Sequence, residues 1–201
     1  MKALTLAVAL AASVVAGQAA AASYVFNAFL NGGNEAPPNA SPGIGFSRLT
    51  LDTSAHTMRI EATFSGLLGT TSAAHVHAPT QLPGVGTASV ATELPSFTGF
   101  PLGVTSGSYD HTFDTSLAAT WNPSFLTNNG GTALGAETGF LTALGDHRAY
   151  LNIHSSFAPG GEIRDFYQLV PEPGSWALMI MGLGFTGALL RRRTSGLPTP
   201  A

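Results

Sequence analysis

Histidines are the residues of this 201-residue chain whose spacing offers chemistry. His75 and His77 are two residues apart, so in a β-strand both side chains point to one face with their Cα atoms ~7 Å apart. Two imidazoles at that separation form a chelating pair for a transition metal. His154 follows another strong strand pattern and precedes the turn at Gly160 and Gly161. We therefore expect a candidate Cu or Zn site at His75, His77 and His154.

Further ligands and a structural alternative must be weighed for this site. Glu162 or His147 is the expected additional ligand, and His111 is a further candidate, although neither of these two histidines has a distinctive sequence setting. In the structural alternative, backbone carbonyls satisfy the imidazoles, or the imidazoles pair with Glu162 and Arg164. His-Val-His also resembles the copper site of Cu/Zn superoxide dismutases, but the chain has no cysteine and no second histidine cluster with an aspartate that can be placed.

Other charged residues favour structural roles over catalysis. Glu35 precedes two prolines in the first loop and is expected to form an ion pair with Arg164 across the sheet, near Glu162. Asp110 and His111 are adjacent, but no nucleophile elbow accompanies them. We therefore predict no catalytic residue, and an enzyme is the less favoured class of protein.

Strands are the elements expected to position these side chains. Apolar and polar residues alternate with a period of two in several segments, and Gly-, Pro- and Asn-rich turns separate them. The expected strands cover residues 24–30, 44–52, 56–64, 73–78, 87–94, 104–113, 149–154 and 162–169.

Within residues 23–169, helical signals occur only in the later part. Asn122 followed by Pro123 predicts an N-cap and a first helical residue, with a helix through Leu126. Residues 132–144 have helical spacing, and Gly145 is a C-terminal stop. The sequence therefore predicts an all-β fold, an antiparallel Greek-key β-sandwich with one or two short helices between late strands.

Composition limits the class of protein further. Residues 23–170 contain four arginines, no lysine and ten acidic residues, a net charge near −6. Nucleic acid is therefore not an expected partner, because binding it requires a basic face. Without cysteine, disulfides and thiolate ligands are excluded. About 150 residues are enough for one domain with its own core.

The first 22 residues predict a secretory signal peptide. Lys2 precedes an apolar stretch over residues 4–15, and small residues end at Ala22, where cleavage is expected. This signal helix would be removed, leaving a domain over residues 23–169.

The last residues predict a second address, over 170–193. Its motif is Val170, Pro171, Glu172 and Pro173, and its basic cluster is Arg191, Arg192 and Arg193. The apolar segment 175–190 between them predicts a membrane-spanning helix, short but extended by interfacial Trp and snorkelling Arg. The arginines should remain cytoplasmic by the positive-inside rule. Residues 194–201 form a tail without an assigned role.

This arrangement resembles the PEP-CTERM sorting signal of Gram-negative bacteria that make exopolysaccharide. The resemblance implies an exosortase as partner, an intermediate held in the inner membrane, and a final place at the cell surface or outside the cell. A plain membrane anchor is the alternative.

Three motifs resemble the CHRD domain, first described in chordin. They cover residues 30–38, 74–77 and 150–164, the last continuing with Asp165 where the family usually has glycine. The resemblance implies an all-β sandwich and no defined activity.

We therefore expect an exported, non-enzymatic surface or matrix module that contacts exopolysaccharide or surface proteins. Phe97 and Phe100, with Trp121 nearby, are expected to be exposed on this contact surface within or beside the irregular segment 79–103. The alternative is a metal-binding domain or dismutase-like metalloenzyme that uses His75, His77 and His154.

Overall fold

One mostly antiparallel sheet forms the body of the protein. The structure, a computed structural model, describes residues 23–171 and Leu183. The strands follow the order β4-β6-β7-β1-β2-β3-β5, and β8 pairs with β1. Their bounds are β1 Ser23–Asn31, β2 Ile44–Asp52, β3 Thr57–Ser65, β4 Thr71–His77, β5 Gly107–Asp114, β6 Tyr150–Ser155, β7 Ile163–Phe166 and β8 Gln168–Leu169.

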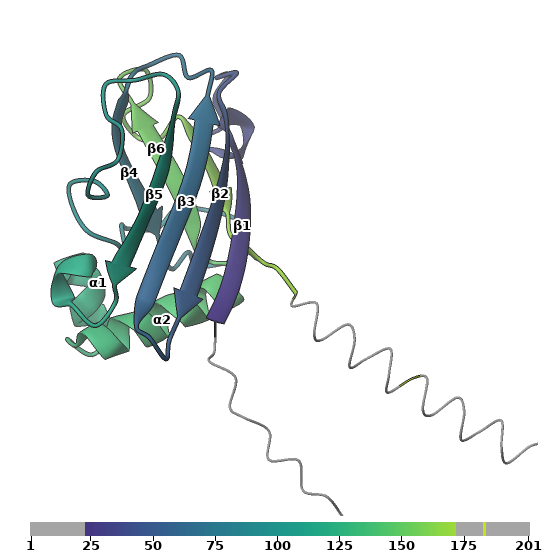
Figure 1. Ribbon diagram of the computed structural model, residues 1–201. Helices are drawn as coiled ribbons and strands as arrows, with labels where there is room; N and C mark the ends of the chain where they lie inside the picture. The colour runs from purple at the N-terminus through teal and green to yellow at the C-terminus, as the bar shows by residue number, and fades with distance from the viewer. Residues whose placement is uncertain (1–22, 172–182, 184–201) are drawn as a thin grey trace, which may run out of the picture.

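The sheet curls so that its two halves face one another. Figure 1 shows β1, β2, β3 and β5 on one side, with β4 and β6 behind them. Pairing of Asn31 in β1 with Arg164 in β7 joins the halves into one curled half-barrel. The predicted antiparallel all-β fold with short helices between late strands is confirmed.

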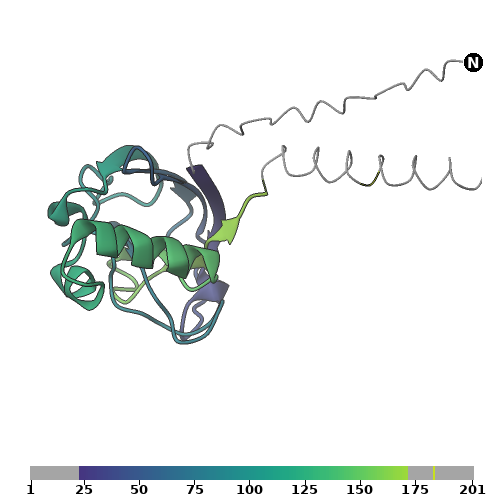
Figure 2. The same ribbon diagram turned by 90° about the horizontal axis from the view of Figure 1, so that it is seen from below.

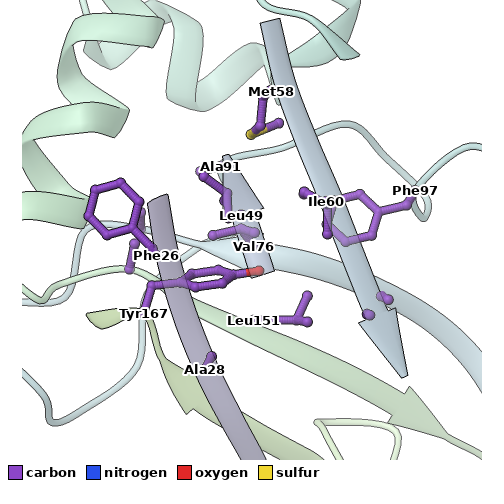
Figure 3. Close-up of a cluster of buried hydrophobic side chains, with 14 of the residues drawn as sticks. Phe26, Ala28, Leu49, Met58, Ile60, Val76, Ala91, Phe97, Leu151 and Tyr167 are labelled. Atoms are coloured by element: carbon purple, nitrogen blue, oxygen red, sulfur yellow. The ribbon is translucent and has the colours of Figure 1, made fainter. Parts of the chain in front are cut away.

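Alternation along the strands builds one core between the halves. Figure 3 shows Phe26, Leu49, Val76 and Leu151 gathered in this space, and each is at most 1% exposed. Burying such a side chain contributes roughly 1.5–3 kcal/mol. Because successive strand residues point to opposite faces, the residues beside Val76, Leu151 and the equally buried Ile153 are turned away from the core. The candidate histidines are among them.

Two helices between β5 and β6 close one end of the sheet. α1 spans Pro123–Asn128, and the Asn122 side chain accepts a hydrogen bond from the Ser124 amide, as the N-cap pattern predicts. α2 spans Ala133–Gly145 and crosses the end of the sheet in Figure 2. Two single 3₁₀ turns complete the elements, η1 at Gly32–Asn34 and η2 at Ala118–Thr120.

The predicted aromatic contact surface is wrong. Phe97, Phe100 and Trp121 are only 3%, 6% and 2% exposed. The Phe97 ring stacks on Tyr109, and the Trp121 indole donates a hydrogen bond to the backbone carbonyl of Thr115. The segment before β5 therefore folds back as a lid on the core, which a short-range pattern does not reveal.

Two predicted strands also differ from the structure. Residues 87–94 form no strand, and only isolated bridges connect Val90 with His77 and Thr92 with Trp121. The last predicted strand is divided into β7 and β8 at Tyr167, which is fully buried and whose amide donates to Ala149 O.

Both ends of the described domain leave the sheet at the same place. β8 pairs with β1 at Phe26, and the Val170 amide donates to Val25 O at 2.8 Å. No helix among the described residues is long and apolar enough to cross a membrane. The signal segment 1–22, the rest of the sorting signal from Glu172 on, including 175–190 and Arg191–Arg193, and the tail 194–201 lie outside the described residues, apart from Leu183.

Candidate metal centre

Strands β4 and β6 bring three histidines together on the face turned away from the core. In the antiparallel register His75 lies opposite Asn152, and His154 lies opposite Ala73. The three ring centroids are 5.2 to 5.8 Å apart. One ring nitrogen from each histidine lies within 4.8 Å of the other two. The structure therefore gathers His75, His77 and His154 into one group.

Backbone carbonyls fix the tautomer of all three rings. His75 Nε2 lies 2.6 Å from Pro95 O, His77 Nδ1 lies 2.9 Å from Ala88 O, and His154 Nδ1 lies 3.0 Å from Pro159 O. A carbonyl oxygen can only accept, so each of these nitrogens carries the hydrogen. The opposite nitrogen of each neutral ring then carries a lone pair.

No hydrogen-bond donor of the described residues faces these lone pairs. His75 Nδ1, His77 Nε2 and His154 Nε2 are buried and have no hydrogen-bond partner among the residues that the structure describes. Buried polar atoms are normally paired, and an unpaired one costs about 1–3 kcal/mol. Three such acceptors side by side therefore need an explanation, and a bound cation supplies one.

Electrostatics keeps the three imidazoles neutral. Burial lowers the pKa of His75, His77 and His154, although the carbonyl hydrogen bonds oppose this, and brings the pKa of His77 to about 4. Neutral imidazole is the form that binds metals. The group is thus ready to bind a metal at neutral pH without first losing protons.

The turn after β6 holds this arrangement in place. Pro159 O accepts a hydrogen bond from the His154 ring, and Gly160 O accepts one from the Asn152 side-chain amide at 3.4 Å. Gly161 has φ +133°, and a Cβ there would lie 2.3 Å from Asn152 Nδ2. Only glycine suits both the backbone conformation and the close approach.

Glu162 anchors that turn and is not available as a ligand. Its side chain accepts hydrogen bonds from the Leu68 and Gly69 amides at 2.6 and 3.2 Å and from the Ser41 and Ser155 hydroxyls. Burial opposes ionisation, but these bonds lower the pKa of Glu162. Both carboxylate oxygens already accept hydrogen bonds, so Glu162, expected as an additional metal ligand, holds this part of the fold instead.

A buried ion pair borders the histidines. Arg164 Nε lies 3.7 Å from Glu35 Oε2 and donates to Asn34 O at 2.6 Å. The Arg164 guanidinium lies 4.6 Å from the Tyr150 ring centre, and that ring stacks on His77 at 5.0 Å. Burial raises the pKa of Glu35 to about 7, against the charge of Arg164. The expected pair of Glu35 and Arg164 is thus in contact, without Glu162.

Comparison with known families agrees with the motifs. Residues 26–166 match the family model of the CHRD domain, and residues 169–193 match the PEP-CTERM protein-sorting motif. The chain belongs to the CHRD domain family. No match was found among curated proteins or among solved structures.

The three motifs of this CHRD domain meet at the candidate centre. The first contributes Glu35, the second His75 and His77, and the third His154 and Arg164. They are distant in sequence, but the pairings of β1, β7, β6 and β4 bring them to one face.

The other two histidines considered as ligands lie elsewhere in the CHRD domain. His147 Nδ1 lies 2.9 Å from Tyr167 O, and the His111 ring packs on Phe113 in β5. Sequence reasoning missed Asn152, which shares the face of His154. The same period of two that placed the histidines was the signal that could have found it.

Proposed function

We propose that this protein is an exported metal-binding module that holds a Cu or Zn ion on His75, His77 and His154. One observation carries the proposal: each of the three histidines has a buried ring nitrogen with a fixed lone pair and no donor among the described residues, and the rings lie so close that one nitrogen of each is within 4.8 Å of the others. Imidazole nitrogen suits both metals.

The residues present fit such an ion. Zn–N bonds are about 2.0–2.1 Å long, which places tetrahedral ligands about 3.4 Å apart, so ring nitrogens within 4.8 Å of one another need to close by at most about 1.4 Å. The carbonyl bonds orient the rings in the manner of outer-shell partners that raise ligand basicity. Three protein nitrogens leave a further coordination position.

The sorting motif supports export and recognition by an exosortase. We extend this to a route in which residues 1–22 direct secretion, the segment 175–190 holds an inner-membrane intermediate, and processing leads to the cell surface or the exopolysaccharide matrix. The plain anchor remains the alternative for the tail.

The position of the histidines is consistent with this route. Pairing connects Asn31, Arg164, Asn152 and His75 in one line across the sheet. Asn31 lies at the far end of β1 from Ser23, about 27 Å away at about 3.4 Å per residue. A domain tethered through Val170 would therefore hold the metal centre well away from the membrane.

Binding is favoured over catalysis. A hollow of about 550 Å³ in the domain is lined by Phe29, Phe46 and their neighbours and not by the histidines. A dismutase of the Cu/Zn type would need a second cluster, and residues 23–171 offer one group of three metal-binding side chains. A superoxide assay of the metal-loaded protein tests this alternative.

Metal titration tests the proposal. Isothermal titration of the apo full-length protein with Cu(II) and Zn(II) should give one site per chain, and His77→Ala should abolish it. His111→Ala is the matched control, because this histidine lies on β5 and is expected to leave binding unchanged. Absence of heat at micromolar metal, with a folded domain, would refute metal binding.

A second candidate is contact with exopolysaccharide through a different aromatic surface. Phe29 and Ile44 are 66% and 62% exposed beside the hollow, and the Phe29 ring packs 5.2 Å from Phe46. Exposed rings suit the apolar faces of sugars. Cosedimentation with the exopolysaccharide of the host should fall when Phe29 is replaced by alanine, whereas metal affinity should not change.

A further inference from the structure

Asn152 is a fourth buried acceptor beside the three histidines. It is 2% exposed, and its Oδ1 has no hydrogen-bond partner within the described domain. It lies directly opposite His75 in the pairing of β4 and β6, and two residues before His154 on the same face. Paired strand residues lie about 4.5–5.5 Å apart at Cα, so the amide borders the histidine group.

The surrounding turn fixes which way the amide points. Asn152 Nδ2 donates to Gly160 O. The flipped amide is excluded, because it would turn Oδ1 toward a carbonyl oxygen, which cannot donate a hydrogen bond. The absent side chain of Gly161 provides the space for this orientation, since a Cβ there would lie 2.3 to 2.4 Å from both amide heteroatoms. Oδ1 is therefore left as an acceptor without a donor, like the three ring nitrogens.

We propose that Asn152 Oδ1 is an oxygen donor to the metal held by His75, His77 and His154. This inference depends on the proposed metal-binding function and deepens it. It gives Asn152 the place of the additional metal ligand, for which the sequence suggested Glu162 or His147. Zinc sites are almost always four-coordinate, and an oxygen beside three nitrogens completes that number.

The donor set also defines the class of ion. Three imidazoles and an amide oxygen are all neutral, and nitrogen-rich sets suit Zn and Cu, whereas Ca and Mg require oxygen ligands. Exchanging the amide for a carboxylate would give the ion a charged oxygen ligand, but it would also turn an oxygen toward Gly160 O, to which Nδ2 now donates. The exchange should therefore appear in the spectrum of the bound metal, which a purely structural amide would leave unchanged.

Three variants of the full-length protein test the assignment. Asn152→Ala should weaken Zn(II) binding about 10- to 100-fold, in line with other residues that support a metal site. Asn152→Asp, which keeps the shape, should alter the visible absorption of bound Co(II), because a carboxylate oxygen replaces the amide oxygen. Asn27→Asp is the control, because Asn27 Oδ1 is also buried without a partner but lies on β1 opposite Gln168.

The outcomes separate this inference from the function on which it rests. If the wild type binds metal and both Asn152 variants match it in affinity and Co(II) absorption, Asn152 is no ligand and the three-histidine site stands. Unchanged Co(II) absorption in Asn152→Asp would also overturn the inference. If the folded wild type binds no metal, both proposals fail. Should the alanine variant not fold, the aspartate variant decides alone.

Discussion

Glu162 and the three histidines are neighbours with opposite hydrogen-bond balance. The carboxylate is fully buried and receives four donors, two from the chain near Leu68 and two from serines. His75 is buried and the other two histidines are partly buried, and each keeps a ring nitrogen that no residue of the described domain satisfies. One short turn, residues 159–161, joins the two groups.

The difference shows how to separate a structural polar group from a binding site. Residue type does not do so, because both glutamate and histidine bind metals. The hydrogen-bond donors around each atom make the distinction. Both oxygens of Glu162 already accept hydrogen bonds, whereas the histidine face consists of acceptors without donors. A complete group stabilises the fold, whereas an incomplete one is a candidate binding site.

The strongest test of this comparison removes the complete group. Glu162→Ala leaves two buried amides and two hydroxyls without their acceptor, and we expect a loss of about 3–5 kcal/mol in the free energy of unfolding. Urea denaturation measures it. Glu162→Gln keeps the shape but turns a donor toward donors, so it should also destabilise. A change below about 1 kcal/mol in both would contradict the structural role.

The dependence of stability on pH tests the charge states of His77 and Glu35. Between pH 4 and 6.5 the unfolded chain protonates His77 and the folded chain does not, so the stability due to His77 rises with pH. Glu35 has the opposite sign. Its folded pKa of about 7 exceeds the ordinary value of 4.5, so its contribution falls as pH rises through this window, by at most about 3 kcal/mol.

Glu35→Gln separates these two contributions. The variant should gain stability relative to the apo wild type as pH increases from 4.5 to 7, and the difference should level off above pH 7. Unfolding curves at several pH values provide the measurement. A difference that stays constant across the window would show that Glu35 ionises normally in the folded protein.

Metal should stabilise the wild type but not a variant of the incomplete group. At 100 times the dissociation constant, a ligand of the folded state adds about 2.7 kcal/mol. His154→Ala should lose this gain, while the apo protein changes by less than about 1 kcal/mol, because within the described domain the ring makes a single hydrogen bond, to Pro159 O. Thermal melts with and without Zn(II) test both expectations. A variant that still gains stability from Zn(II) would exclude His154 as a ligand.

The sequence predicted which side of a strand each side chain occupies better than it predicted which strands pair with one another. A period of two correctly placed His75 and His77 on one side of β4, and the first three strands begin and end within one residue of expectation. Convergence with His154 depends on β4 pairing with β6, about 75 residues later, which no local pattern specifies.

The errors had the same origin. Glu162 was expected as a ligand because the amides of Leu68 and Gly69 that occupy it come from a distant turn. Phe97 and Phe100 were expected at the surface because a Pro- and Gly-rich segment is usually exposed, whereas here it folds over Tyr109 and the core. Tertiary contacts decided each case.

A second histidine–carboxylate group provides the mildest test. His56 Nδ1 lies 3.0 Å from Glu137 Oε2, which also accepts from the Thr115 hydroxyl, at the end of the sheet that α2 covers. This group is complete, so His56→Asn should cost only about 0.5–1 kcal/mol, as expected for the loss of one hydrogen bond from a partly exposed side chain. Asparagine suits the φ of +52° at this position. Metal affinity should be unchanged, and any loss of affinity would show that the two histidine groups are coupled through the sheet.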